Sequence, residues 1–525
     1  MKRLLLVVSA FAAAWATACG GGSSNIIAPP PPTGGFTNAS LNGAYVFAMT
    51  GTVFDPNNFT SSFDSFSRVG VFIADGKGNI AASGGLEDVH KFGADNTFAL
   101  TGGSYAINAD GRGTLSLITA GNTIQYSISL SSPTDGYMVD MIADDSETAS
   151  GSFTLQSATT LATGTYVFDF AGVAPDGTGN AISIVGDFIP NGAGSFSSGS
   201  FEDINEAGSL ISKASISGGS YVIDNNNPGT GRGTATIGGI DYVYYVIDGQ
   251  RVQLMCIDPD AANPGTILGE AVAQQAGTPN DVTSFNSSSF VFVMAGSDVT
   301  SGFPFTRGGR LTATGGGLTN ILIDSNDGAS VRSLPLLSGG TVTLDGDNSG
   351  RGTLTFTDTV QNTGTYTFVF YLNSATQGVV QDVSTAGGVA VVADGTLLAQ
   401  TGAPFSSSGL AANYAFNWSG VDNNGQEEDF VGALATGGTS PNGAADFNEF
   451  GATKQFFNNA FNGVITIGGD GTGSTGMHSA FIATINGSPT TTINYFAYIA
   501  NPSTILLMGT GPSRVTAGVL TAQTQ

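Results

Sequence analysis

The chain contains two histidines, His90 and His478, and they are the first residues to consider for catalysis or metal binding. They fall in different copies of a repeat that is described below. A Ser-His-Asp triad or a multi-histidine metal site would therefore require contact between separate domains. We predict that neither histidine is catalytic, and that His90, within residues 87–91, is a solvated residue at the end of a strand.

Two clusters of carboxylates could in principle supply the acid and the base of a glycoside hydrolase. They are Glu202-Asp203 and Glu427-Glu428-Asp429. With 40 acidic residues in the chain, some clusters arise by chance, and solvated surfaces explain them better. We therefore predict a protein that is not an enzyme, with no catalytic residue and no cofactor. An envelope carbohydrate-active enzyme is the least favoured alternative.

Calcium binding is suggested by residues 345–350, where Asp, Asp and Ser alternate with Gly and Asn as in the first half of an EF-hand loop. The twelfth position of that loop is Phe356, which has no ligand oxygen in its side chain. Residues 75–79 and 176–180 have a similar composition and are better explained as hairpin turns. We predict no metal site.

Three arginines stand at equivalent places in the repeat, each between two glycines: Arg112, Arg232 and Arg351. Each could bridge a neighbouring carboxylate or cover an aromatic face, or the three could form a ligand site that recurs in every copy. The substitution Arg232→Ala separates these alternatives. It lowers stability if the arginine is structural, and it affects binding alone if the arginine contacts a ligand.

Internal repeats determine the domain organisation. Three short motifs keep one order along the chain at a spacing of about 120 residues. The opening motif contains Tyr45, Tyr166, Phe290 and Tyr414. The middle motif contains the three arginines, and the closing motif ends in Gln156, Gln274, Gln400 and Gln523. We expect four domains: 39–158, 159–278, 279–403 and 404–525.

Alternating apolar and polar residues, interrupted by Gly, Asn and Asp, predict antiparallel strands throughout each domain. In the first copy we expect strands near 43–53, 67–75, 80–89, 99–109, 113–120, 123–131, 136–143 and 149–157. The fold class is therefore all-β, with four tandem antiparallel meander domains of about eight strands each. A closed β-barrel is favoured over a β-sandwich because closure leaves no free edge.

The opening strand predicts how each interior is filled. Tyr45, Phe47 and Met49 share one face of that strand, while Ala44, Val46 and Ala48 share the other. We expect the large side chains to point inward and the small or polar ones outward.

Charge and cysteine content limit the partners. A net charge of −25 opposes contact with phosphate backbones, so nucleic acid is not expected as a partner. The chain has two cysteines, Cys19 and Cys256. Cys256 alternates with Val252 and Leu254 on one strand face, which favours a buried and unreactive thiol.

The N-terminus has the order of a secretory signal: Lys2 and Arg3, an apolar run over 4–15, and small residues before Cys19. The segment Ala16-Thr17-Ala18-Cys19 resembles the lipobox of bacterial lipoproteins. That resemblance implies a signal peptide over 1–18 and a lipid on Cys19. Residues 19–38, rich in Gly, Ser and Pro, form a tether, and the protein is expected at the cell envelope, at the outer membrane or the cell surface.

A repeat that opens with an aromatic motif, continues through a meander of about eight strands and carries a recurrent arginine resembles the lipocalin and calycin barrels. The resemblance implies a barrel that carries a small apolar ligand.

We therefore expect a membrane-anchored, non-catalytic binding, adhesion or spacer protein of the envelope. The alternative is a lipocalin-like carrier of a small apolar ligand. Besides the membrane, a glycan, an envelope protein or a small apolar molecule are the expected partners.

Overall fold

The computed structural model describes residues 35–525 with several gaps. It leaves out 55–62, 142–146, 217, 259–264, 286–287, 334–336, 338, 359–363, 385–389, 423–424, 437–441, 451–454, 469–478, 486–490 and 512–513. The predicted signal peptide, Cys19 and His478 lie outside the described residues.

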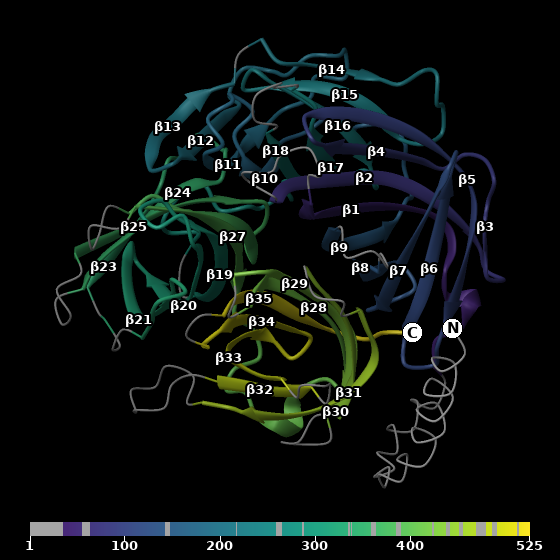
Figure 1. Ribbon diagram of the computed structural model, residues 1–525. Helices are drawn as coiled ribbons and strands as arrows, with labels where there is room; N and C mark the ends of the chain where they lie inside the picture. The colour runs from purple at the N-terminus through teal and green to yellow at the C-terminus, as the bar shows by residue number, and fades with distance from the viewer. Residues whose placement is uncertain are drawn as a thin grey trace, which may run out of the picture. The chain divides into compact units, whose positions relative to one another are not determined.

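The first barrel contains nine strand segments (Figure 1). They are β1 (Asn42–Phe54), β2 (Phe63–Asp75), β3 (Asn79–Ile80), β4 (Leu86–Lys91), β5 (Ala94–Ile107), β6 (Arg112–Thr119), β7 (Asn122–Leu130), β8 (Asp135–Asp140) and β9 (Glu147–Leu155). Strand β1 pairs with both β2 and β9, so the sheet closes. The single strand expected at 80–89 is divided into β3 and β4, because residues 81–85 leave the sheet at Gly84, whose φ is 85°.

The second sheet is open. Its strands are β10 (Tyr166–Val173), β11 (Ala181–Phe188), β12 (Phe201–Glu206), β13 (Ser209–Ser215), β14 (Ser220–Ile223), β15 (Arg232–Ile237), β16 (Ile240–Val246), β17 (Arg251–Cys256) and β18 (Thr266–Ala273). The two ends of this sheet are β13 and β14, which are not paired with each other among the described residues.

The third and fourth sheets close. The third contains β19 (Ser288–Asp298), β20 (Pro304–Thr314), β21 (Gly317–Asn326), β22 (Val331–Ser333), β23 (Gly340–Leu344), β24 (Arg351–Asp358), β25 (Gly364–Leu372), β26 (Gln377–Asp382) and β27 (Val391–Ala399). The fourth contains β28 (Asn413–Val421), β29 (Glu427–Ala435), β30 (Asn442–Glu449), β31 (Gln455–Thr466), β32 (Ser479–Ile485), β33 (Thr491–Asn501), β34 (Thr504–Gly509) and β35 (Val515–Ala522). Two short 3-10 turns, η1 (Asn38–Ser40) and η3 (Ser407–Gly409), are the helical elements of the described residues.

These pairings confirm the predicted fold class of tandem antiparallel meanders, with three closed barrels and one half-barrel formed by the second sheet. We call each of the four domains a barrel. The four sheets belong to one compact unit, Pro31–Gln525. In the described part of the chain, no helix has the length and apolar character needed to cross a membrane.

Each barrel interior is filled by aromatic side chains from its first strand, as predicted. In the first barrel Tyr45, Phe47 and Met49 are buried in the core. In the fourth barrel the rings of Phe416 and Trp418 stack with centroids 4.0 Å apart.

An aromatic ring and a glycine face each other on the first two strands of every barrel. The pairs are Phe47 and Gly70, Phe168 and Gly186, Phe292 and Gly309, and Phe416 and Gly432. A Cβ atom at Gly432 would lie 2.3 Å from the Phe416 ring. The glycine therefore leaves the space that the ring fills, which explains why a phenylalanine recurs two residues after the first aromatic residue of the opening motif.

Candidate functional site

Each barrel ends in a glutamine whose side chain binds the next barrel. The Nε2 atom donates a hydrogen bond to a backbone carbonyl: Gln156 to Val246 (2.6 Å), Gln274 to Leu372 (3.0 Å), Gln400 to Ile499 (2.9 Å) and Gln523 to Leu130 (2.9 Å). The last contact runs from the fourth barrel back to the first. The four barrels therefore form a closed cycle of contacts, and the closing motif of the repeat is what joins them.

The residue after each of these glutamines makes a second contact with the next barrel, through its backbone amide. Amide groups donate to carbonyl oxygens of the next barrel from Ser157 to Ile247 (2.7 Å), Gln275 to Asn373 (2.7 Å), Thr401 to Ala500 (2.8 Å) and Thr524 to Ser131 (2.8 Å). Two independent hydrogen bonds thus connect each barrel to its successor, and both are present where the C-terminus meets the first barrel.

Arg351 lies at the seam between the second and third barrels. Its Nε and Nη2 atoms donate to Asp203 Oδ2 (2.7 Å) and Oδ1 (2.8 Å), and the Tyr371 hydroxyl donates to Oδ2 (2.7 Å). Burial alone would raise the pKa of Asp203, but the hydrogen bonds from Arg351 and Tyr371 outweigh it and hold that pKa below its ordinary value.

The equivalent arginines differ in their contacts. Arg232 binds Asp88 of the first barrel through Nε (2.7 Å) and Nη2 (2.8 Å). Arg112 Nη1 is 4.0 Å from Asp446 of the fourth barrel, and its Nε binds Asp110 in its own loop (2.9 Å). The arginines predicted as ligand or structural positions are thus placed at three of the four seams, where they face carboxylates.

His90 is fully buried, so the prediction that it is solvated was wrong. In the other three barrels an asparagine takes the place of His90. It follows, two residues later, the aspartate that is equivalent to Asp203. Asn205 shows the role of the position, because its Nδ2 donates to the carbonyls of Asp382 (2.9 Å) and Val391 (2.8 Å) in the next barrel. His90 Nδ1 lies 2.6 Å from Asp95 Oδ1. His90 therefore stands at the position that Asn205 uses to contact the next barrel, while its own partner is Asp95 of the first barrel.

The carboxylates expected on solvated faces are also buried. Asp203 is 1% exposed, Glu428 1% and Asp429 0%. Asp429 accepts hydrogen bonds from Thr148 Oγ1 (2.9 Å) and Ser150 Oγ (2.6 Å) of the first barrel. Asp203 and Asp429 lie between barrels, so a surface position on one barrel does not mean contact with solvent. Glu428 pairs with Arg514 of its own barrel (2.9 Å).

The outward face of the opening strand is also buried against a neighbouring barrel. Val46 and Ala48 point out of the first barrel, as predicted, but both are buried against Tyr245 and Met255 of the second barrel. The recurrence of small apolar residues on this face was the one sequence signal that could have indicated contact between barrels.

The loop considered for calcium is occupied by protein cations. Lys213 Nζ lies 2.6 Å from Asp345 and 2.7 Å from Asp347, and Arg351 Nη1 lies 3.0 Å from Asp345. Within the described residues, no group of three or more His, Cys, Asp and Glu side chains could hold a metal ion.

Cys256 lies in the core of the second barrel, as predicted. Burial raises the pKa of its thiol to about 12. The thiol is therefore protonated and unreactive at neutral pH.

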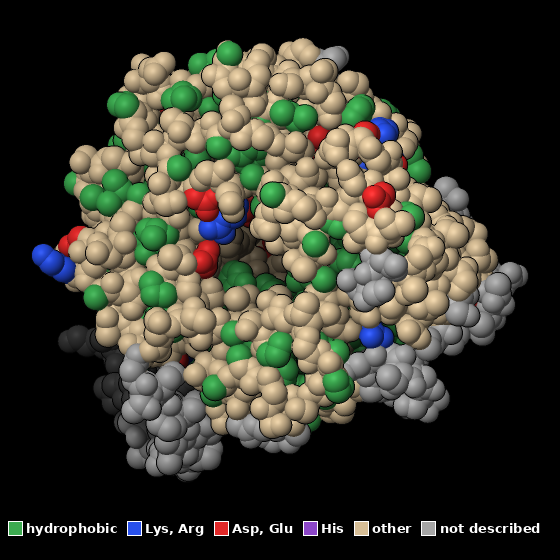
Figure 2. Space-filling model, turned by 180° about the vertical axis from the view of Figure 1, so that it is seen from behind, with side chains coloured by type: hydrophobic (Ala, Val, Ile, Leu, Met, Phe, Trp, Pro, Cys, Tyr) green, Lys and Arg blue, Asp and Glu red, His purple; other side chains and the backbone are tan. Residues whose placement is uncertain are grey.

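Three hollows lie between the barrels and share lining residues, and together we call them the central cavity. The first hollow, about 690 Å³, is lined by residues of all four barrels, including Tyr137, Arg251, Gln377 and Thr521. Gln377 also lines the middle hollow of about 330 Å³. Figure 2 shows a depression of this kind on one face of the molecule, with acidic and basic side chains beside it.

The third hollow of the central cavity, about 690 Å³, shares Ala171 and Asp394 with the middle one. It is also lined by Thr52 and Glu427, from the first and fourth barrels. Cavities of about 300–1,000 Å³ with a few converging polar groups are typical of small-molecule sites. The central cavity is therefore the candidate functional site.

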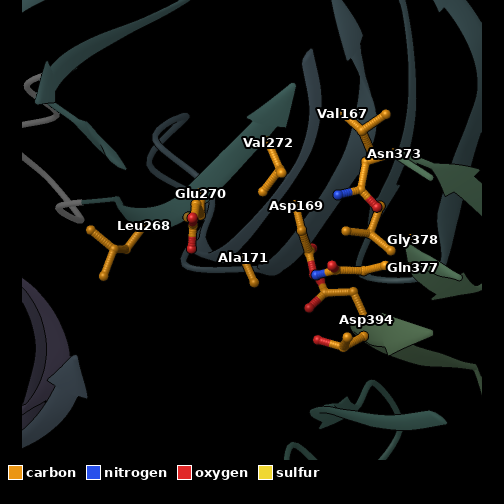
Figure 3. Close-up of a pocket in the computed structure, with 13 residues that line it drawn as sticks. Val167, Asp169, Ala171, Leu268, Glu270, Val272, Asn373, Gln377, Gly378 and Asp394 are labelled. Carbon is orange, nitrogen blue, oxygen red and sulfur yellow. The ribbon is translucent and has the colours of Figure 1, made fainter. Parts of the chain in front are cut away.

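The middle hollow combines apolar walls with carboxyl and amide groups (Figure 3). Asp169 on β10 and Glu270 on β18 are direct cross-strand neighbours, and Asp394 comes from β27 of the third barrel. Figure 3 shows Asp169 and Asp394 close together and Glu270 apart from them.

The acids of the middle hollow have raised pKa values. Burial raises the pKa of Asp169 well above its ordinary value, and the neighbouring Asp394 raises it further. Burial raises the pKa of Asp394 to about 7, against a lowering effect of the Ser183 hydroxyl. Burial also raises the pKa of Glu270 to about 7, against the opposing charge of Arg251. Asp394 and Glu270 therefore take up or release protons near neutral pH.

No family model matches the sequence, and no curated protein matches it. Solved structures give matches at low identity. A double mutant of transferrin binding protein B from Haemophilus parasuis Hp5 aligns with 12% identity over 74% of this chain and 83% of that chain, with a TM-score of 0.19. The intact Ap-TbpB, with N and C lobes, aligns with 10% identity over 92% and 95%, with a TM-score of 0.19. A protein from Nitrosomonas europaea, described as a putative AttH, aligns with 11% identity over 70% and 95%, with a TM-score of 0.16. TM-scores this low carry no conclusion, so the fold description depends on the strand pairings above.

Proposed function

We propose that the protein is a lipid-anchored, non-catalytic binding protein of the cell envelope, and that its ligand site is the central cavity. The observation that carries this proposal is the closed cycle of barrels around a cavity lined by residues of all four. A spacer would extend along the chain, whereas here the end of the fourth barrel returns to the first. The arrangement surrounds a set of connected open hollows, which favours binding over spacing.

The lipocalin-like carrier is less well supported, because it requires a hollow barrel. The interiors are occupied by buried rings such as Tyr45, Phe168, Phe292 and Trp418. Titration with cis-parinaric acid, a fluorescent fatty acid, distinguishes the two functions. Filled barrels predict no saturable increase in its fluorescence, and a carrier predicts one.

The anchor depends on the lipobox-like segment and the tether in the sequence. Labelling of growing cells with a clickable palmitate analogue should transfer the label to the wild-type protein and not to Cys19→Ser. Equal labelling of both would refute the anchor. The unlabelled variant should also leave the membrane fraction.

The binding site is tested by saturation-transfer NMR with a mixture of amines, amino acids, monosaccharides and short fatty acids. Ala171 lines both the middle and the third hollow, so Ala171→Trp fills the connection between them. The exposed Ala82 provides the matched control, Ala82→Trp. We expect at least one compound to bind the wild type and the control but not Ala171→Trp. A mixture that gives no signal, or signals unchanged in Ala171→Trp, would contradict the assignment.

A further inference from the structure

The charges that line the central cavity are strongly unbalanced. One guanidinium, that of Arg251, lines it, together with the carboxyl groups of Asp135, Asp169, Glu270, Asp298, Asp394 and Glu427. Several of these acids are partnered by the protein: Asp298, for example, accepts hydrogen bonds from the backbone amides of Thr300 and Ser301. An excess of acidic residues does not by itself indicate a ligand site. The carboxylate oxygens that lack a partner in the protein are the stronger indication.

Two carboxylate oxygens in the middle hollow are buried without a hydrogen-bond partner, Oδ1 of Asp169 and Oδ2 of Asp394. Asp394 as a whole is only 9% exposed. Buried polar atoms without partners are rare in folded proteins, and each costs about 1–3 kcal/mol unless something satisfies it. The two carboxyl groups face each other (Figure 3), so without a donor between them they repel once both are ionised.

Glu270 adds a third carboxyl group to the middle hollow, and a purely structural role does not explain why three acids are kept there. Asp169 and Glu270 are paired on neighbouring strands, which brings a third carboxyl group to the wall of the same hollow. Among the residues that the structure describes, burial and Asp394 are the influences on the Asp169 carboxyl, and no cation is one of them. The fold therefore keeps three acids in one hollow without neutralising two of them.

Resting on the proposed binding function, we propose that the ligand of the middle hollow is an aliphatic diamine or polyamine. One ammonium group lies between Asp169 and Asp394 and donates to their unpartnered oxygens. A second lies at Glu270.

The shape and the walls of the hollow favour this class of cation over a metal ion. The acids are too dispersed in the described structure for three of them to hold one ion. Figure 3 shows Glu270 separated from the other two, with Ala171 between them in this view. Val167, Leu268 and Val272 supply apolar walls that suit a methylene chain between two ammonium groups.

Binding is coupled to protons because burial raises the pKa values of Asp394 and Glu270 to about 7. An ammonium group favours the ionised carboxylates, so a proton held by Asp394 or Glu270 is released to solvent when the amine binds. The groups that face these acids are Ser183 for Asp394, and Arg251, Asp248 and Asp135 for Glu270. Affinity therefore rises from pH 5.5 to pH 8.

The test is calorimetric titration of the soluble chain, residues 20–525, with 1,4-diaminobutane and spermidine. Two buffers of different ionisation enthalpy give the number of protons released. We expect one molecule bound per chain, proton release near pH 7, and binding about tenfold weaker at pH 5.5 than at pH 8. 1-Aminobutane should bind at least about tenfold more weakly than the diamine, because it leaves one acid unpaired.

Asp169→Asn is the decisive variant, and Asp241→Asn, at an exposed position, is its control. Asp169→Asn should weaken diamine binding at least about tenfold. It should also raise the melting temperature of the free protein at pH 8, because it removes a repelling carboxylate. If the role of Asp169 were purely structural, the substitution would lower both the diamine affinity and the melting temperature, or it would change neither. Asp241→Asn should leave both unchanged.

The outcomes separate this inference from the proposed function. Diamine binding that is equal in the wild type and Asp169→Asn overturns the inference. Binding of a monosaccharide or a fatty acid that Ala171→Trp abolishes, without diamine binding, also overturns it but leaves the cavity as a binding site. If no compound binds and Ala171→Trp has no effect, both proposals fail.

Discussion

The two arginines Arg351 and Arg112 occupy the same position of the repeat, yet replacing each by alanine should have very different effects on stability. The side chain of Arg351 is 8% exposed and makes a bidentate contact with the Asp203 carboxylate, whose side chain is 2% exposed. Arg351→Ala leaves that carboxylate buried without its cation. Removing one partner of a buried pair costs about 3–5 kcal/mol, so we expect a loss of that size in the free energy of unfolding.

Arg112→Ala removes much less. Its Nη1 is 4.0 Å from Asp446, and its close partner Asp110 is 30% exposed and lies in the same loop. Pairs of that kind contribute about 0–1 kcal/mol, so we expect a loss of about 1 kcal/mol. The pair of variants isolates the contact with the neighbouring barrel, because both lose the same side chain from the same strand position.

The assay is equilibrium unfolding in urea followed by far-ultraviolet circular dichroism, with Tyr371→Phe as a third variant. Tyr371 donates to Asp203, and loss of a hydrogen bond to a charged group costs about 1.5–3 kcal/mol, between the other two values. Equal losses in Arg351→Ala and Arg112→Ala would refute the reasoning, since the arginine would then act within its own barrel and not across the seam.

Three further predictions follow from the seams and the core. Burial raises the pKa of Asp140 to about 8 and that of Asp429 to about 6, so the stability linked to their protonated forms is fully present only below the unfolded-state pKa of about 4. It is lost as the pH rises from there to about 6 for Asp429 and about 8 for Asp140, so the melting temperature should fall between pH 4 and pH 8, and less steeply in Asp140→Asn. Gln523→Ala leaves the carbonyl of Leu130 without its donor and should lower the urea midpoint by the equivalent of about 1–3 kcal/mol, whereas no shift would show that the contact is absent in solution. The Cys256 thiol should not react with Ellman's reagent in the native protein at pH 8 and should react fully in urea; rapid reaction in buffer would place it outside the core.

The sequence predicts individual barrels well because the signals are local. Alternation along the opening strand places Tyr45 and Phe47 inside, and the Gly238-Gly239 hairpin has the two positive φ angles, 60° and 91°, that a primed turn requires. Residues 75–79 form the predicted turn, in which Asp75 accepts from the amide of Lys77.

Contacts between barrels could not be predicted in the same way, because each is made by residues more than seventy positions apart. Asp203 and Asp429 look like surface residues of one barrel, but they are buried and bonded to Arg351 and Thr148 of neighbouring barrels. The recurrent Gln and Arg residues did signal a shared role in every copy. Their spacing could not show whether the shared partner was a ligand or the neighbouring copy.

Hydrogen exchange at the amide of Thr524 tests the closed cycle most directly. This residue is next to the last in the chain, where an unattached terminus exchanges at the rate of an unfolded peptide. Here its amide donates to the carbonyl of Ser131 in the first barrel (2.8 Å). Mass spectrometry with fragmentation of the C-terminal peptide should show Thr524 protected from exchange at neutral pH, and unprotected exchange at this amide would mean that the fourth barrel does not close on the first.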